Sequence, residues 1–214
     1  MTRKDRSNWY FCNQMNVQLT DKIECIFKHT LLLIQEHGFH GTPMSQIAKS
    51  SDVAIGTIYH YFPSKEELIL QLYDYCKREI HRYIFDDMDK SLSYKEQFFI
   101  VFKRFCSFYQ HNTDKFSFME QFYNSPFFEM VKDKTCDGDG PYEENKVIAF
   151  LLQGMEKNIL KKLDVCILSS AYIGVAVSFS KSVLYGKIQF NEKHLDDLIE
   201  IIWNGIKQQH EHEL

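Results

Sequence analysis

The sequence predicts an all-α protein of about nine helices, and two patterns support this fold class. Apolar residues recur at spacings of three and four along most of the chain, which is the period of an amphipathic helix. The alternation of apolar and polar residues that indicates a β-strand persists nowhere in the sequence. The 214 residues include only 4 Pro and 9 Gly, so few positions interrupt the helical pattern.

The composition is that of a folded cytoplasmic protein. Hydrophobic residues make up 44% and charged residues 25%, and the six cysteines form no CxxC pair, which favours free thiols in a reducing compartment. The N-terminus lacks the apolar run of a signal peptide, and the longest apolar stretch is shorter than the roughly 20 residues of a membrane span. The net charge of −4 predicts no general affinity for nucleic acid.

Three short helices are predicted near the N-terminus, after a flexible polar arm over residues 1–19. Thr20 supplies an N-cap for the first helix, and Gly38 ends it. Thr42 and Pro43 open the second helix as its cap and first helical residue, and Pro63 blocks continuation of the third. The predicted ranges are 20–37, 43–50 and 55–61.

The second and third helices have the features of a helix-turn-helix. Ala48 is a small residue where two crossing helices would touch, and Val53 is an apolar anchor. Asp52 favours a tight turn, because Asp tolerates left-handed backbone. Gly56 would allow the close approach of a DNA groove or phosphate to the third helix. Polar and aromatic residues that can read base edges follow it, namely Thr57, Tyr59, His60 and Tyr61.

Lys65 lies in the first turn of the next helix, where a cation opposes the helix dipole. A lysine at a helix N-terminus can bind phosphate, although Glu66 and Glu67 can instead compensate its charge. The remaining helices are predicted over residues 64–85, 94–110, 114–124, 126–132, 142–162, 164–184 and 192–209.

A dense resemblance to the tetracycline-repressor (TetR/AcrR) family of transcriptional regulators spans about 50 residues. The matching residues are Ile47-Ala48, Val53, Gly56-Thr57-Ile58-Tyr59-His60-Tyr61-Phe62 and Ser64-Lys65-Glu66-Glu67-Leu68, preceded by Gly38-Phe39 and Thr42. The resemblance implies a helix-turn-helix DNA-binding domain over residues 20–66. A helical domain for ligand sensing and dimerisation would follow over residues 67–214.

The resemblance also implies roles for individual residues. Thr42 would cap the second helix and contact a phosphate, and Lys65 would bind another phosphate. Ile55, Gly56, Thr57 and His60 would face the major groove, while Tyr59 and Tyr61 would contact the DNA backbone or base edges.

Two residues depart from the family pattern. Ala54 stands where Ser or Thr is usual, which removes a cap worth about 1 kcal/mol and a phosphate contact. Ile55 occupies a position that is often polar, which favours contact with a thymine methyl group. We therefore expect low DNA affinity for one domain and a need for two domains in a dimer.

The segment from Phe116 to Phe128 is unusually aromatic, and it forms either bundle core or the wall of an effector cavity. The residues predicted to contact an effector are Phe105, Tyr109, Phe118, Met119, Phe122, Tyr123, Phe127 and Tyr172.

The last two helices predict a homodimer. Residues 164–184 are apolar on nearly all faces, and such a helix must be covered on both sides. Residues 192–209 add an apolar stripe. The predicted interface residues are Val175, Phe179, Leu195, Ile199, Ile202, Trp203 and Ile206.

The leading hypothesis is a ligand-responsive transcriptional repressor. It would bind a palindromic operator as a homodimer and be released by a small apolar or aromatic effector, with the helix over residues 64–85 as the lever. The alternative is a helical carrier of apolar ligands, or an adaptor, that no longer binds specific DNA. Common catalytic motifs are absent from the sequence, so we expect neither an enzyme nor a metal, cofactor or membrane partner.

Overall fold

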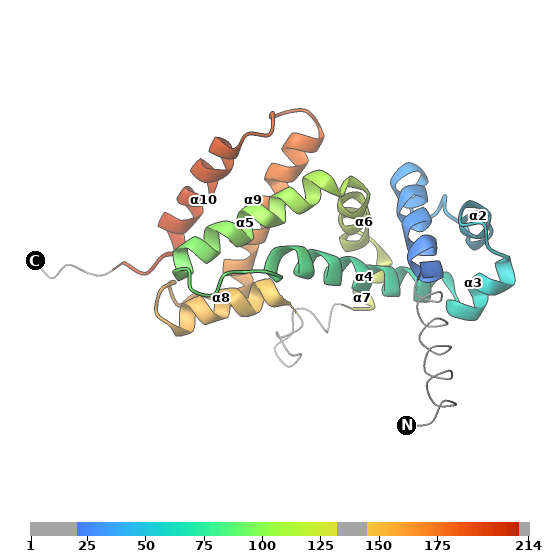
Figure 1. The fold of residues 1–214 in the computed structure, drawn as a ribbon, viewed down its shortest axis with the longest axis horizontal. Helices are drawn as coiled ribbons and strands as arrows, with labels where there is room; N and C mark the ends of the chain where they lie inside the picture. The colour runs from blue at the N-terminus through green and yellow to red at the C-terminus, as the bar shows by residue number, and fades with distance from the viewer. Residues whose placement is uncertain (1–20, 132–144, 210–214) are drawn as a thin grey trace, which may run out of the picture. The chain divides into compact units, whose positions relative to one another are not determined.

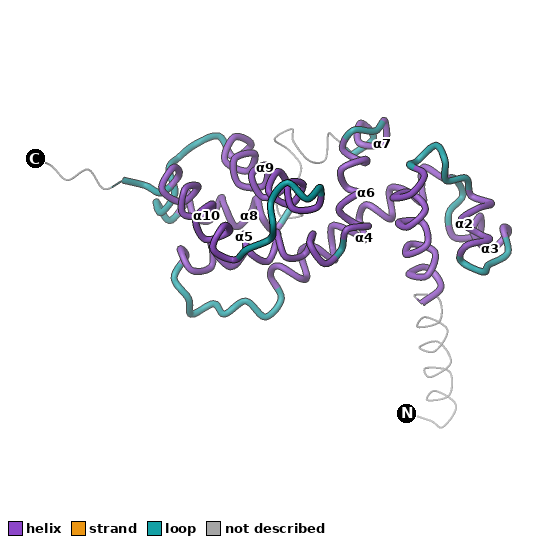
Figure 2. The backbone as a smooth tube through the Cα atoms, turned by 90° about the horizontal axis from the view of Figure 1, so that it is seen from above, coloured by secondary structure: helices purple, strands orange, loops and turns teal. Residues whose placement is uncertain are grey.

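The computed structural model describes residues 21–131 and 145–209, and within these ranges it contains helices and one isolated β-bridge (Figures 1 and 2). The all-α prediction is confirmed, while the predicted arm over residues 1–19 lies outside the described residues. A helix over residues 21–37 comes first. It is followed by α2 (Met44–Ser50), α3 (Ile55–Tyr61), α4 (Lys65–Phe85), α5 (Tyr94–His111), α6 (Thr113–Tyr123), α7 (Pro126–Glu129), α8 (Lys146–Glu156), α9 (Val165–Leu184) and α10 (Glu192–Ile206).

The described residues divide into two compact units. The first unit holds residues 21–74 and 117–127, and the second holds the remaining described residues. The division between these compact units falls inside α4, after Asp74. The physical reason is packing: Tyr73 of α4 stacks on Phe122 of α6 with ring centroids 4.2 Å apart, which joins both segments to the first unit.

The core of the first unit combines the three N-terminal helices with the ends of α4 and α6 that belong to it. Ile34, Ile47 and Ile58 come from the three N-terminal helices, and all are fully buried. Phe118 and Phe122 of α6 are fully buried as well. The aromatic segment of α6 thus stabilises the helix-turn-helix unit by burying apolar surface.

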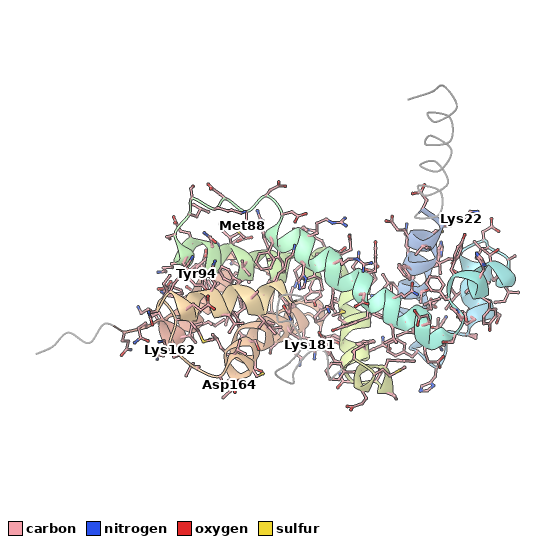
Figure 3. All side chains as sticks on the ribbon, turned by 90° about the horizontal axis from the view of Figure 1, so that it is seen from below. Lys22, Met88, Tyr94, Lys162, Asp164 and Lys181 are labelled. Carbon is pink, nitrogen blue, oxygen red and sulfur yellow. The ribbon has the colours of Figure 1, made fainter. Side chains whose placement is uncertain are left out.

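The second unit is built around α5, which packs against α9 and α10 (Figure 1). Two buried tyrosines join α5 to α9 and to α8, because each donates a hydrogen bond to a backbone carbonyl of the neighbouring helix. Tyr172 of α9 donates its hydroxyl to the Phe98 carbonyl at 2.7 Å. Tyr94 of α5, labelled in Figure 3, donates to the Phe150 carbonyl of α8 at 2.9 Å. Buried hydroxyls need such partners, so these bonds specify how the helices pack.

A row of ion pairs joins α5 to α10 at the surface of the second unit. Lys103 Nζ lies 2.6 Å from Asp196 Oδ1, and Lys95 Nζ lies 3.5 Å from Glu200 Oε2. Exposed pairs of this kind contribute up to about 1 kcal/mol each to stability. Their main effect is therefore to select the register of α10 against α5.

α7, α8 and α10 end at least three residues earlier than their sequence patterns predict, and α7 stops at Glu129 in place of residue 132. α8 stops at Glu156 and α10 at Ile206, in place of residues 162 and 209. Asn158 adopts a left-handed φ of 54°, which turns the chain after α8. The two helix ends then pair with each other, since Lys161 N donates to the Ile206 carbonyl and Gln208 N to the Ile159 carbonyl, both at 2.8 Å.

α9 is long and apolar enough to cross a membrane by length and composition, and it is the one such helix among the described residues. In this structure it packs against α5 and α8 in the second unit. The core helix of a folded bundle meets the same length and composition limits, so this property alone identifies no membrane span.

Candidate nucleic-acid interface

α2 and α3 form the predicted helix-turn-helix. Ser51 N donates to the Ile47 carbonyl at 2.9 Å, and Val53 N donates to the Ala48 carbonyl at 3.1 Å. Asp52 takes a φ of 52° between them, as the turn prediction requires. Ala48 is buried where the two helices touch.

α3 is anchored on one side and exposed on the other. Ile58 is fully buried and holds the helix against the unit, whereas Ile55 and Tyr59 expose 43% and 50% of their surface. Gly56 and His60 are also exposed, and Thr57 and Tyr61 are half-buried. The exposed face therefore offers an imidazole, a phenol and an aliphatic group, which are chemical groups that read base edges in a major groove.

The N-terminus of α3 has no side-chain cap, because Ala54 occupies the N-cap position. The expected loss of this cap is therefore confirmed. Ile58 N and Thr57 N still bond to the Ala54 carbonyl, at 3.3 and 2.8 Å, so the first turn forms without it.

Thr42 is placed differently from its predicted role. It is fully buried, and its hydroxyl donates to the Gly38 carbonyl at 2.8 Å. Pro43 is the N-cap residue of α2 and makes no side-chain cap. The Thr42 hydroxyl is thus used within the loop that precedes α2, where a phosphate cannot reach it in this conformation.

Lys65 also points into the protein. Its ammonium group donates to the Phe39 carbonyl, and this partial burial lowers the pKa of Lys65 by desolvation, against the opposing charge of Glu66. The capping sequence after Pro63 forms in part, since Glu67 N donates to Ser64 Oγ at 3.1 Å. The structure therefore shows an internal partner for the lysine that the resemblance assigns to a phosphate.

The predicted effector residues are divided between the two units. Phe118, Met119, Phe122, Tyr123 and Phe127 belong to the first unit, and Phe105, Tyr109 and Tyr172 belong to the second. Most are packed core, because all except Tyr123 and Phe127 are buried.

Six of the seven predicted dimer residues are buried within the single chain. Only Val175 is half-buried, and the other six expose at most 7% of their surface. Trp203 shows the reason: its ring contacts Phe98 of α5 at 5.2 Å, so it faces the interior of its own unit. The large apolar side chains exposed on the same two helices are Ile167, Leu184 and Ile201, and Ile167 and Ile201 are the most exposed of these.

Two features of the structure were missed by the sequence analysis. Gln121 of α6 donates its side-chain amide to the Ile34 carbonyl at 3.1 Å, across 87 positions in the sequence. No local sequence pattern predicts a hydrogen bond between residues so far apart in the sequence. A surface pocket of about 320 Å³ also lies along the start of α5, lined by Leu92, Lys95, Glu96, Phe99 and Ile100.

A helix-turn-helix with an exposed second helix defines a DNA-binding regulator as the class of this protein. Residues 26–72 match the family described as bacterial regulatory proteins, tetR family, and residues 93–207 match the tetracyclin repressor-like C-terminal domain. The chain belongs to the TetR family of transcriptional regulators, and proteins of this family are not enzymes.

Similar proteins cover nearly the whole chain. An uncharacterised helix-turn-helix transcriptional regulator of Haemophilus influenzae is 26% identical over 191 residues, which is 88% of this chain and 97% of that relative. The crystal structure of a TetR-family regulator from H. influenzae matches 89% of this chain and 98% of its own, with 25% identity and a TM-score of 0.76. A regulator from Marinobacter aquaeolei shares the fold at 16% identity, with a TM-score of 0.77 over 91% of this chain and 100% of its own.

Proposed function

We propose that this regulator is a cytoplasmic repressor that binds a palindromic operator as a homodimer and is released by a small apolar or aromatic effector. The observation that carries the DNA-binding part is the exposed face of α3, with Ile55, Gly56, Tyr59 and His60 directed away from the unit's core. Two copies of α3 would enter successive major grooves about 34–36 Å apart, which explains the palindrome.

The test is selection of an operator from a pool of random duplexes, followed by affinity measurements with single-base variants. His60→Ala and Thr57→Ala should flatten the preference among these variants, because both side chains would contact base edges. Lys193→Ala on α10, far along the chain from α3, is the matched control and should leave the preference unchanged. A parent protein that enriches no sequence would support the carrier or adaptor alternative.

The homodimer is supported by the uncovered face of α9. Only 28% of its most apolar 18-residue window is buried in the single chain. Ile167 exposes 64% of its surface, and Ile201 on α10 exposes 70%. Ala171 and Gly174 extend the exposed face of α9 with small residues, against which a second copy could pack closely. We therefore assign the interface to these outward residues, in place of the buried set that the sequence predicted.

The effector proposal rests on the aromatic core of the second unit. Phe105 contacts Tyr109 with ring centroids 5.0 Å apart, and both lie in the C-terminal half of α5. The pocket at the start of α5 provides a second apolar surface, including Phe99. Mass spectrometry of a copurified compound, followed by operator binding with and without it, tests the proposal. Loss of the response in Phe105→Ala assigns the effector to the core, and loss in Phe99→Ala assigns it to the pocket.

A further inference from the structure

The loop between the first helix and α2 is held by hydrogen bonds to its backbone carbonyls. We call residues 34–42 the junction. Gly38 has a left-handed φ of 68°, and its amide closes the first helix by donating to the Ile34 carbonyl at 2.9 Å. Thr42 N donates to the Phe39 carbonyl at 3.3 Å. The junction fixes where the helix-turn-helix begins, since α2 starts two residues after it.

The Ile34 and Phe39 carbonyls each accept a second hydrogen bond, from a side chain that is distant in the sequence. Gln121 Nε2 of α6 donates to the Ile34 carbonyl at 3.1 Å, and Lys65 Nζ of α4 donates to the Phe39 carbonyl. Each of these carbonyls thus accepts a side-chain hydrogen bond in addition to its backbone bond, and carbonyls near a helix C-terminus lie at the negative end of the helix dipole. An ammonium and an amide N–H are therefore well suited to this position.

Aromatic packing places α6 and the adjoining α7 against the junction. The Phe39 ring lies 5.9 Å from Phe118 and 5.2 Å from Phe127, in edge-on contacts. All of these residues belong to the first unit. Polar and apolar contacts from α6 thus converge on one loop of the DNA-binding unit.

We propose that Gln121 and Lys65 are positioning residues for DNA binding, which hold the junction and so set the angle at which α2 and α3 leave the first helix. This inference rests on the proposed function and extends it to two side chains that contact the protein in place of the operator. Through Gln121, the C-terminal end of α6 would also contribute to DNA binding.

The experiment compares Gln121→Met and Lys65→Met with Gln71→Met as the matched control. Methionine keeps length and packing while it removes the donor, and Gln71 bonds only to Glu67 on the surface of α4. Two readouts are needed: hydrogen exchange of the Gly38 and Thr42 amides in the free protein, and operator affinity over a range of salt concentrations.

We expect faster exchange at both amides and about tenfold weaker operator binding for each variant, with the slope of log affinity against log salt unchanged. Gln121→Lys restores a donor and should recover exchange and affinity. Lys65→Arg should do the same for Lys65, and Gln71→Met should behave like the parent.

A slope reduced by about one per site in Lys65→Met would overturn the positioning role of that residue, because it would show a lost phosphate contact. Parental exchange rates in Gln121→Met, or no recovery in Gln121→Lys, would overturn the role of Gln121. Absence of operator binding in the parent would refute the proposed function. The hydrogen-exchange measurement is made without DNA, so it would still show whether Gln121 and Lys65 hold the junction.

Discussion

At the scale of single residues, no contact within the free chain explains why residue 56 is a glycine. It lies in α3 without a left-handed φ, and a Cβ atom built on it would meet no atom within 4 Å. Glycine inside a helix costs about 0.5–1 kcal/mol relative to alanine. The close approach of an operator to the exposed face, as proposed above, would account for a glycine at this position.

We predict that Gly56→Ala stabilises the free protein by up to about 1 kcal/mol and weakens operator binding, because the new methyl group would meet the DNA. Thermal unfolding and operator titration check the two effects. Gly205→Ala on α10 is the control, since its Cβ also meets open space. It should stabilise the protein without changing affinity. Unchanged operator affinity in Gly56→Ala would exclude close approach at this residue.

His81 is the second residue with a testable property. Burial and, to a smaller extent, the positive charges of Lys77 and Lys146 lower the pKa of the half-buried His81 imidazole from 6.5 to about 4. The Asn145 side chain opposes this shift by hydrogen bonding to the ring. His81 is therefore neutral in the folded protein at neutral pH.

We predict that His81 makes the protein lose stability as the pH falls from about 6.5 to about 4. In this window the unfolded chain binds a proton at His81 that the folded chain does not, so acid favours unfolding. His81→Gln should lose less stability over the same window. Urea unfolding of the two proteins at several pH values measures this difference. Parallel pH profiles would contradict the prediction.

At the scale of elements, α5 and α8 meet at a contact that leaves no room for a side chain. A Cβ atom on Gly154 of α8 would lie 2.3 Å from the Tyr94 hydroxyl oxygen and 2.8 Å from a methyl carbon of Leu160. The same hydroxyl donates to the Phe150 carbonyl one turn earlier in α8. The glycine thus permits the hydrogen bond that joins the two helices.

We predict that Gly154→Ala destabilises the protein by about 1–3 kcal/mol, since the added methyl group displaces the Tyr94 ring from a packed core. Helix propensity alone would give the opposite sign. Chemical denaturation measures the effect, and Gln153→Ala on the exposed side of α8 is the control. A stabilised Gly154→Ala protein would show that the Tyr94 contact is not formed.

The positions at which α8 and α10 end are not determined by the sequence of each helix alone. The sequence pattern predicts helices that continue to residues 162 and 209, past Glu156 and Ile206. The bridge between Leu160 and Lys207 ends both helices together. It joins residues 47 positions apart, and no local spacing encodes such a pair.

At the scale of the whole molecule, the proposed homodimer depends on the outward face of α9 and α10. We predict that Ile167→Glu combined with Ile201→Glu gives a folded monomer with much weaker operator binding, because two charges would be buried in the interface. Sedimentation, circular dichroism and operator titration distinguish these effects. Trp203→Glu is the contrasting variant and should unfold the chain, since Trp203 exposes only 7% of its surface. A dimeric double variant would place the interface elsewhere.

The covalent connections between the two units are the second property at this scale. α4, α6 and α7 each contribute residues to both units, so the helix over residues 64–85, predicted to act as the lever, is one of three covalent connections. Phe122 is fully buried in the first unit and stacked on Tyr73. We therefore expect Phe122→Ala to weaken operator binding even without an effector, in contrast to a cavity-wall residue, and operator titration of the free variant measures this.

The sequence by itself determined the helical elements and the helix-turn-helix. The pattern around Ala48, Asp52 and Ile58 depends on contacts between residues a few positions apart, and such local interactions are readable from spacing and residue type. The resemblance to a family added the groove-facing role of α3. The exposure of Ile55, Gly56 and His60 agrees with that role.

Only the tertiary structure decided which of several chemically equivalent residues face inward. Ile201 and Trp203 are both apolar and two positions apart, yet packing against α5 buries Trp203 and leaves Ile201 exposed. The partner of Lys65 is likewise the Phe39 carbonyl, which a folded loop brings within reach of its ammonium group. These outcomes depend on segments tens of residues apart, whose positions are set by the burial of the whole core and not by local sequence.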